Sequence, residues 1–431
     1  MRYDELYLWL LTEPASPRYV GQLRLVDAGK GVSLQYAAGW LSGGFPLSED
    51  LPLVDIEHLP RWKGMAVGAV DDARPDRWGE RVIQYIDKPA RLSIMEYLYY
   101  AGDDRFGALG VSTSADEYLP RAKSPVPRLA QAQELAEVVH KVSAKEPVND
   151  IERKLLAAGG SFGGAKPKAL IEIDGEQWVI KFFNNEPIDV PLIEHASMTL
   201  AEKAGITVAQ TRVIQLVGEN ALAVRRYDRS GASRIHCISA GTALRAETVA
   251  GQEPELGYPS LAQLLRRVGV ADGDFNLLDM QELFRRMVFN ILIDNTDDHE
   301  KNHALMVVAP SKQGKYRLAP AYDVLPTNSG QGYQEFIVGT DQRDSTLANA
   351  MSQCALFGYT PAQAATEVVR VIEVVDGWRE HFATCGVTES DLESLAERID
   401  GDPLLTQRRH FNPADYPAPR RSTRGGGAFG R

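Results

Sequence analysis

Acidic, amide and cationic side chains gather within residues 293–302, IDNTDDHEKN. Asp297 and Asn302 are separated by five positions, in the pattern D-x-x-x-x-N. In the catalytic loop of protein kinases, this spacing lets the aspartate orient the acceptor hydroxyl while the asparagine oxygen reaches a magnesium ion. The stretch therefore predicts ATP- and Mg²⁺-dependent phosphoryl transfer, with Asp297 as the catalytic residue and Asn302 as a metal ligand.

The neighbours of this pair have other expected roles. Asp298 is the nearest competitor of Asp297, but it lacks the five-position spacing to Asn302. His299 is expected to form structural hydrogen bonds, because phosphoryl transfer asks little of a base. Lys301 is a candidate contact of the nucleotide, with a solvated side chain as the alternative.

A second metal ligand is expected at Asp323, in the stretch LAPAYDVLP. Two strand-like runs, ALMVV and YRLAP, bracket the turn-forming residues PSKQGK and predict a hairpin that begins beside Asn302. Asp323 follows this hairpin, so we expect it to lie within reach of Asn302.

A glycine-rich stretch, GGSFGG, precedes two further strand-like runs. Its backbone N–H groups can turn toward phosphates, with a flexible connection as the alternative. We assign nucleotide binding to Gly163 and Gly164 of this stretch and to Ala165, which follows it.

The two runs flank Asp-Gly at 174–175, a strong signal for a two-residue hairpin loop. This register places Lys168 opposite Lys181. Since directly opposed like charges are unfavourable, an anion such as a nucleotide triphosphate is expected between them. A longer turn would separate the two lysines.

The helix expected over 191–205 places Glu194 in its first turn. Glu194 could pair with Lys181, as a helix acid pairs with the strand lysine in protein kinases, or serve the helix dipole. The strand ALAVRRYDR then leads into a linker between two lobes, and Tyr227 in it is a further candidate for the nucleotide site. Its arginines could touch nucleotide, but a salt-bridged linker is the simpler interpretation.

The order of elements predicts an α+β protein with a two-lobed kinase-like core. Residues 1–126 form a β-rich N-terminal domain, 127–230 a nucleotide-binding lobe and 231–410 a mainly helical lobe, and 411–431 is expected to be a disordered tail. Prolines between 118 and 128 mark the first boundary. In the helical lobe, Asp279 with Glu282 three positions later predicts a capping box at a helix start.

Composition limits the function classes. A net charge of −11 argues against sequence-independent nucleic-acid binding, which needs concentrated Lys and Arg. No apolar run is long enough to span a membrane, and three dispersed cysteines match no metal spacing and fit a reducing compartment. We therefore expect a cytoplasmic globular protein with two or three domains.

At these motifs the chain resembles the HipA family, the toxin kinases of bacterial toxin–antitoxin pairs. SFGGAKPKAL resembles the family's phosphate loop, TDDHEKNHAL its catalytic loop and LAPAYDVLP its metal-binding segment. FPLSEDLPL, PDRWGERV and DRFGALGVS resemble its N-terminal domain, so that the likeness covers roughly residues 20–400.

The resemblance implies a Ser/Thr kinase that phosphorylates a cytosolic protein, such as an aminoacyl-tRNA synthetase, and binds a small DNA-binding antitoxin. It also implies that Lys181 holds the α- and β-phosphates and that Ser161 matches a loop serine whose autophosphorylation silences the kinase. Direct nucleic-acid contact is expected only through the antitoxin. Two alternatives stay open: a small-molecule kinase or AMP transferase on the same fold, and a catalytically silent subunit that binds an antitoxin and aids DNA repression.

Overall fold

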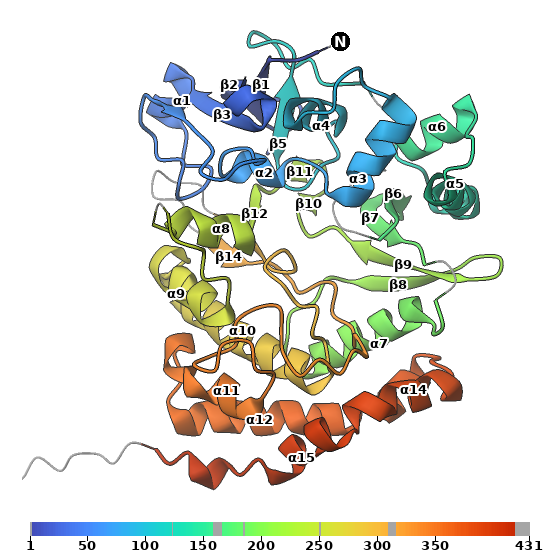
Figure 1. The fold of residues 1–431 in the computed structure, drawn as a ribbon, viewed down its shortest axis with the longest axis vertical. Helices are drawn as coiled ribbons and strands as arrows, with labels where there is room; N and C mark the ends of the chain where they lie inside the picture. Colours follow the sequence, from blue (N-terminus) through green and yellow to red (C-terminus); the bar gives the residue numbers. More distant parts are fainter. Residues whose placement is uncertain are drawn as a thin grey trace, which may run out of the picture.

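The N-terminal domain is built on a five-stranded antiparallel sheet of order β4-β3-β2-β1-β5 (Figure 1). The computed structural model describes residues 2–122, 124–157, 166–183, 186–249, 251–308 and 316–418. Alternating apolar residues form the first two strands, whose inner side chains are buried. The strands are β1 Glu5–Leu10, β2 Arg18–Val26, β3 Gly31–Tyr36, β4 Glu57–His58 and β5 Leu109–Ser112.

Short helices connect the strands of this domain. They are α1 Ala38–Gly43, α2 Ala69–Asp72, α3 Arg77–Val82 with the π-helical turn Ile83–Asp87, and α4 Ile94–Tyr100. Ser93 and Glu96 form a capping box at the start of α4. Trp78 and Val82 on α3 pack into the hydrophobic cluster of the following lobe, so α3 joins the two units.

The nucleotide-binding lobe contains a four-stranded antiparallel sheet of order β6-β7-β9-β8. Asp174 and Gly175 both have positive φ, 53° and 78°, which is the conformation that a tight two-residue hairpin requires. The predicted register is confirmed, because Lys168 pairs with Lys181. The strands are β6 Lys168–Ile173, β7 Glu176–Lys181, β8 Thr211–Gln215 and β9 Asn220–Arg225.

Three helices accompany this sheet: α5 Ala132–Ala144, α6 Asp150–Ala157 and α7 Val190–Lys203. Asp189 caps α7 by accepting a hydrogen bond from the Leu192 N–H, and Pro191 occupies the first turn. The predicted place of Glu194 in the first turn is therefore wrong: since the cap lies at Asp189, Glu194 falls in the second turn.

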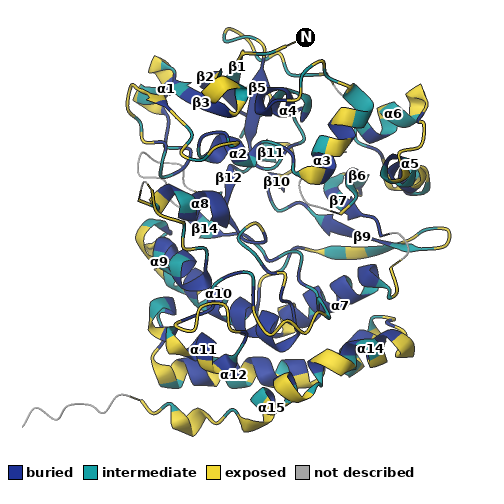
Figure 2. Cartoon of the chain, in the orientation of Figure 1, coloured by how far each residue is buried: buried dark blue, intermediate teal, exposed yellow. Residues whose placement is uncertain are grey.

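The helical lobe surrounds the long helix α10, which is buried along most of its length, whereas α14 and α15 keep exposed faces (Figure 2). Its helices are α8 Ala240–Glu247, α9 Tyr258–Val268, α10 Phe275–Leu292, α11 Leu347–Ser352, α12 Pro361–Asp376, α13 Trp378–Thr384, α14 Glu389–Ile399 and α15 Asp402–His410. A three-stranded sheet of β12 Cys237–Ser239, β13 Ala304–Val307 and β14 Tyr316–Leu318 carries the hairpin predicted before Asp323. The small ladder of β10 Arg229–Ser230 and β11 Ser233–Arg234 precedes it.

The start predicted for α10 is wrong. The helix begins at Phe275, after Asp274 in a left-handed conformation, rather than at Asp279. Asp279 lies inside the helix and accepts hydrogen bonds from the Arg317 side chain and the Leu318 N–H. This tertiary contact to β14 replaces the local capping box that the sequence spacing suggested.

Part of the predicted tail packs on the helical lobe. The Phe411 and Tyr416 rings stack with centroids 5.6 Å apart, and both are partly buried against the core. Residues 419–431 lie outside the described part of the chain. Within that part, no helix is both long and apolar enough to cross a membrane.

Candidate active site

The loop after α10 presents two adjacent aspartates to different surroundings. Asp297 is exposed, and its backbone carbonyl accepts a hydrogen bond of 3.4 Å from the Asn302 amide nitrogen. Partial burial raises the pKa of Asp297, and the negative charge of Asp323 adds to the effect. Asp297 thus offers a carboxylate at the protein surface beside Asn302.

Asp298 is buried, and its carboxylate is hydrogen-bonded to other side chains. It accepts a hydrogen bond from the Tyr258 hydroxyl, and its Oδ2 lies 2.8 Å from His303 Nε2. Burial would raise the pKa of Asp298, but His303 and these hydrogen bonds outweigh it and lower the pKa. Asp298 therefore anchors the loop internally, which leaves Asp297 as the acid available to a substrate.

A buried lysine joins the two lobes. Lys181 Nζ on β7 lies 2.6 Å from Glu194 Oε1 on α7 and 2.6 Å from Asp323 Oδ1. Burial alone disfavours the ammonium, but the carboxylates of Asp323 and Glu194 outweigh it and raise the pKa of Lys181. The predicted Lys181–Glu194 pair is present, and the contact with Asp323 was not foreseen.

Lys168 stands beside this cluster on β6. Burial lowers the pKa of Lys168, and the positive charge of Lys181 adds to the effect. Lys166, two residues earlier, is exposed and places Nζ 4.8 Å from the centroid of the Phe183 ring. Three lysines therefore face the carboxylates of the site, a charge pattern suited to a polyphosphate.

Asn302 and Asp323 can supply oxygen ligands to a hard cation. The Asn302 amide nitrogen is engaged with the backbone of Asp297, which leaves its oxygen for a metal. Burial opposes ionisation of Asp323, but Lys181 and Lys168 outweigh it and hold the pKa of this carboxyl well below its usual range. A carboxylate with one amide oxygen fits Mg²⁺, which takes few protein ligands and shares substrate phosphates. Among the described residues, no three His, Cys, Asp or Glu side chains form a metal cluster.

Two tyrosines lie between the lobes. The Tyr227 and Tyr322 rings stack with centroids 5.6 Å apart, and the Tyr322 hydroxyl donates to the Lys301 carbonyl over 2.7 Å. Tyr227, predicted in the nucleotide site, thereby borders the segment that carries Asp323.

Four predicted residues lie outside the described part of the chain: Ser161, Gly163, Gly164 and Ala165. Their roles in binding phosphate or accepting it stay predictions.

Family models account for most of the chain. The HipA N-terminal domain matches residues 15–112, and the HipA-like C-terminal domain matches residues 160–378, which is more than half of the chain. The chain belongs to the HipA family. The resemblance first seen in the three motifs is confirmed.

Curated relatives of this HipA-family chain match only part of it. It is 30% identical over 167 residues to "Putative kinase Y4dM" of Sinorhizobium fredii (strain NBRC 101917 / NGR234), covering 36% of this chain and 38% of that protein. A second protein of that strain, "Putative kinase Y4mE", is 31% identical over 139 residues, covering 30% of this chain and 31% of the relative. The chain thus spans less than two fifths of either relative's length.

A solved structure extends the likeness to the whole fold. A chain of the complex of the Shewanella oneidensis MR-1 toxin–antitoxin proteins HipA and HipB with operator DNA superposes with a TM-score of 0.63, at 17% sequence identity. The match covers 94% of this chain and 96% of that one. The predicted α+β kinase-like architecture is therefore confirmed.

Sequence reasoning missed two contacts of the HipA-family site. Lys301 Nζ lies 2.5 Å from Asp76 Oδ1, and the Trp78 indole donates to the Lys168 carbonyl over 2.7 Å. Asp76 and Trp78 belong to the N-terminal domain, more than 200 and 80 positions away from these partners in the sequence. Their motif, PDRWGERV, indicated the domain but not the contacts.

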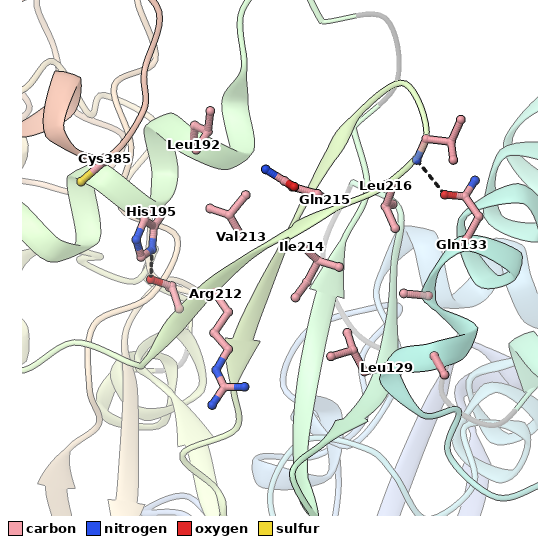
Figure 3. Close-up of a pocket in the computed structure, with 14 residues that line it drawn as sticks. Leu129, Gln133, Leu192, His195, Arg212, Val213, Ile214, Gln215, Leu216 and Cys385 are labelled. Atoms are coloured by element: carbon pink, nitrogen blue, oxygen red, sulfur yellow. Dashed lines mark hydrogen bonds between the residues drawn. The ribbon is translucent and has the colours of Figure 1, made fainter.

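A surface groove lies apart from this site. A volume of about 1080 Å³ runs along β8, the outer strand of the four-stranded sheet, between the start of α5 and helix α7 (Figure 3). Leu129 and Gln133 line one side of it, and Leu192, His195 and Cys385 the other. None of the predicted site residues lines this groove, so its size says nothing about the predicted chemistry.

Proposed function

We propose that this protein is an ATP-dependent protein kinase that phosphorylates serine or threonine. One observation carries the proposal: Lys181 joins Glu194 and Asp323 at 2.6 Å each, and the charge of Asp323 also reaches Asp297. A strand lysine paired with a helix acid, beside a catalytic aspartate and two metal ligands, is the set of groups that phosphoryl transfer by kinases requires.

Each residue has one role in the proposed reaction. Lys181 and Lys168 bind the nucleotide phosphates, and Asp297 orients the acceptor hydroxyl and takes up its proton. The hydroxyl oxygen forms the new bond to the γ-phosphorus while the bond to the β,γ-bridging oxygen breaks, so that ADP leaves. Asn302 and Asp323 would hold Mg²⁺, which supplies neutralisation of the phosphate charge.

The raised pKa of Asp297 suits this role. A carboxylate that binds protons more readily than usual takes up the hydroxyl proton with a smaller thermodynamic penalty. Catalysis then depends mainly on positions and charges rather than on a strong base. Lys181, held by Glu194 and Asp323, and the buried Asp298 supply such positions.

The partners are proposed from the family alone. HipA in the similar solved structure is part of a toxin–antitoxin system with HipB and operator DNA. By this analogy we propose a small DNA-binding antitoxin for this chain, and a cytosolic protein such as an aminoacyl-tRNA synthetase as its substrate. Regulation by autophosphorylation of Ser161 belongs to the same proposal.

Intact mass after incubation with Mg-ATP tests the reaction, with Asp297→Asn as the inactive partner. We expect the parent to gain one phosphate at Ser161 and the variant to gain none. A phosphate at another site would retain the kinase and contradict the role of Ser161. Addition of AMP instead of phosphate would establish nucleotide transfer, the first alternative.

The second alternative, a silent antitoxin-binding subunit, makes a different prediction. Such a subunit would show neither autophosphorylation nor ATP hydrolysis. A starting mass equal to that of the bare sequence would show that the lack of a gain is not due to a phosphate already present. A parent of unmodified mass that stays unmodified and hydrolyses no ATP would therefore contradict the proposed kinase.

A further inference from the structure

Residues 76–78 of the N-terminal domain contact both lobes of the kinase-like core. Lys301 Nζ, in the loop after α10, lies 2.5 Å from Asp76 Oδ1. Two residues further on, the Trp78 indole N–H donates to the backbone carbonyl of Lys168 over 2.7 Å. Lys168 opens β6 in one lobe, and Lys301 belongs to the other. One short segment therefore ties together the two halves of the proposed phosphate site.

Trp78 fixes the place of this segment. Its side chain is buried and packs with Val82 in the hydrophobic cluster formed by α5 and the strands β6, β7 and β9. A buried indole with a satisfied N–H has little freedom to move. The position of Asp76 is consequently set by the packing of α3 against the nucleotide-binding lobe.

Asp76 does not serve the helix that it precedes. It occupies the N-cap position of α3, where an aspartate ordinarily accepts a hydrogen bond from the first turn, yet its side chain makes no such bond. The carboxylate is directed to Lys301 instead. Its charge also reaches Lys168, where it partly opposes the burial that lowers the pKa of that lysine.

Lys301 gains a fixed position from this pair. A lysine side chain has four rotatable carbon–carbon bonds and samples many rotamers when its ammonium is free. Charge stabilisation in a transition state is most effective when the charged group is already in place. The backbone carbonyl of Lys301 is also held, by the Tyr322 hydroxyl, so both ends of the residue are restrained.

We propose that Asp76 is a positioning residue for phosphoryl transfer, which holds the Lys301 ammonium beside the transferred phosphoryl group and makes the N-terminal domain part of the catalytic unit. This inference rests on the proposed function. Asp76 takes no part in bond making or breaking and acts on the reaction through Lys301.

The test compares four variants of the full-length chain. Asp76→Asn removes the charge with little change in shape, Asp76→Glu keeps it, Lys301→Met removes the partner, and the fourth combines Asp76→Asn with Lys301→Met. We expect Asp76→Asn to lower kcat about tenfold while the KM for ATP changes less than about threefold, since ground-state binding is retained. Asp76→Glu should recover part of the loss, and the double variant should be no slower than Lys301→Met alone.

Asp4→Asn is the matched control. Asp4 lies in the same domain and pairs with Arg91 at 2.6 Å, but its side chain is 78% exposed and no predicted site residue contacts it. This variant should retain the parent's kcat and KM. Melting temperatures verify that all variants are folded.

A kcat of Asp76→Asn equal to that of the parent would overturn the inference. So would a double variant that is slower than Lys301→Met by the full factor seen for Asp76→Asn, because Asp76 would then act independently of Lys301.

A second measurement needs no enzymatic activity. Acetylation of Lys301 by a limiting amount of acetic anhydride, followed by peptide mass spectrometry, should be several-fold faster in Asp76→Asn than in the parent. Equal rates would show that the ion pair does not hold the lysine. A parent that transfers no phosphate would overturn the proposed function and the catalytic role of Asp76, while the labelling would still decide whether the pair exists.

Discussion

Two clusters of buried charged residues lie close to the junction of the lobes and differ in how far solvent reaches them. In the first, Asp228 accepts hydrogen bonds from Arg226, from Arg229 and from the Gly107 N–H. The side chains of Arg226, Asp228 and Arg229 are only 1%, 5% and 6% exposed. We call this cluster closed, because solvent hardly reaches any of its three side chains.

The second cluster, Lys181 with Glu194 and Asp323, is open at one carboxylate. The side chains of Lys181 and Glu194 are 9% and 1% exposed, but that of Asp323 is 40% exposed. Asp323 can therefore exchange or share its lysine partner with a ligand, whereas Asp228 cannot. The difference separates a structural use of buried charge from a chemical one.

The largest expected effect is the loss of activity when the open cluster is altered. Asp323→Asn should lower the rate of phosphoryl transfer by on the order of a thousandfold, because it removes the carboxylate that would hold Mg²⁺ and that pairs with Lys181. Lys181 retains Glu194, so the melting temperature should change little. Autophosphorylation rates and thermal melts of the same preparation check both statements.

The opposite outcome is expected for the closed cluster. Asp228→Ala leaves two buried guanidinium groups without their carboxylate and should lower the free energy of unfolding by about 3–5 kcal/mol. Urea denaturation measures the change. An Asp228 variant that is as stable as the parent would remove the distinction between the two clusters.

The functions of the two clusters should also be lost at different pH values. Asp297, beside the open cluster, must be ionised to accept a proton, and burial raises its pKa. Activity should therefore fall as the pH drops through a value above the usual aspartate pKa of about 3.9. The pKa of Asp228 is held far below its usual range, despite burial, by Arg226 and Arg229. Its stabilisation is present above about pH 3.9 and is lost only as the pH falls below that value.

A pH range should then exist in which the protein is folded and inactive. Profiles of kcat and of melting temperature against pH would reveal it. Coincident loss of activity and of stability on acidification would contradict the assignment of separate roles.

The parts of this site that local rules determine were predictable from the sequence. The Asp-Gly turn determines the pairing of Lys168 with Lys181, and the five-position spacing selects Asp297 over Asp298, which the structure buries against Tyr258 and His303. In each case the deciding interaction joins residues close together in the chain.

Contacts between residues far apart in the chain could not be predicted from these local patterns. The start of α10 was misplaced because Asp279 serves β14 instead of a helix cap. The pairing of Asp76 with Lys301 depends on how two units pack, and no spacing within one motif encodes it. Single-sequence patterns report turns, periods and motif spacing, whereas tertiary packing determines which polar groups meet.

The smallest effect is expected for replacement of Arg225. Its neighbour Arg226 makes this the sharpest control, because the two residues are of the same type and differ in burial. Arg225 pairs with Glu176 at 3.1 Å, with side chains 39% and 37% exposed, whereas Arg226 is buried against Asp228. Arg225→Gln should therefore change the free energy of unfolding by less than about 1 kcal/mol. Arg226→Gln leaves a buried carboxylate with fewer donors and should cost about 3 kcal/mol or more.

Urea denaturation of the two variants in 50 mM and 500 mM salt distinguishes the causes. Salt screens exposed charges far more than buried ones, so the small effect of Arg225→Gln should shrink further at high salt while that of Arg226→Gln persists. Equal costs for the two arginines would mean that exposure does not separate structural from replaceable charge in this molecule. The contrast between Asp228 and Asp323 would then lose its physical basis, since it rests on the same property.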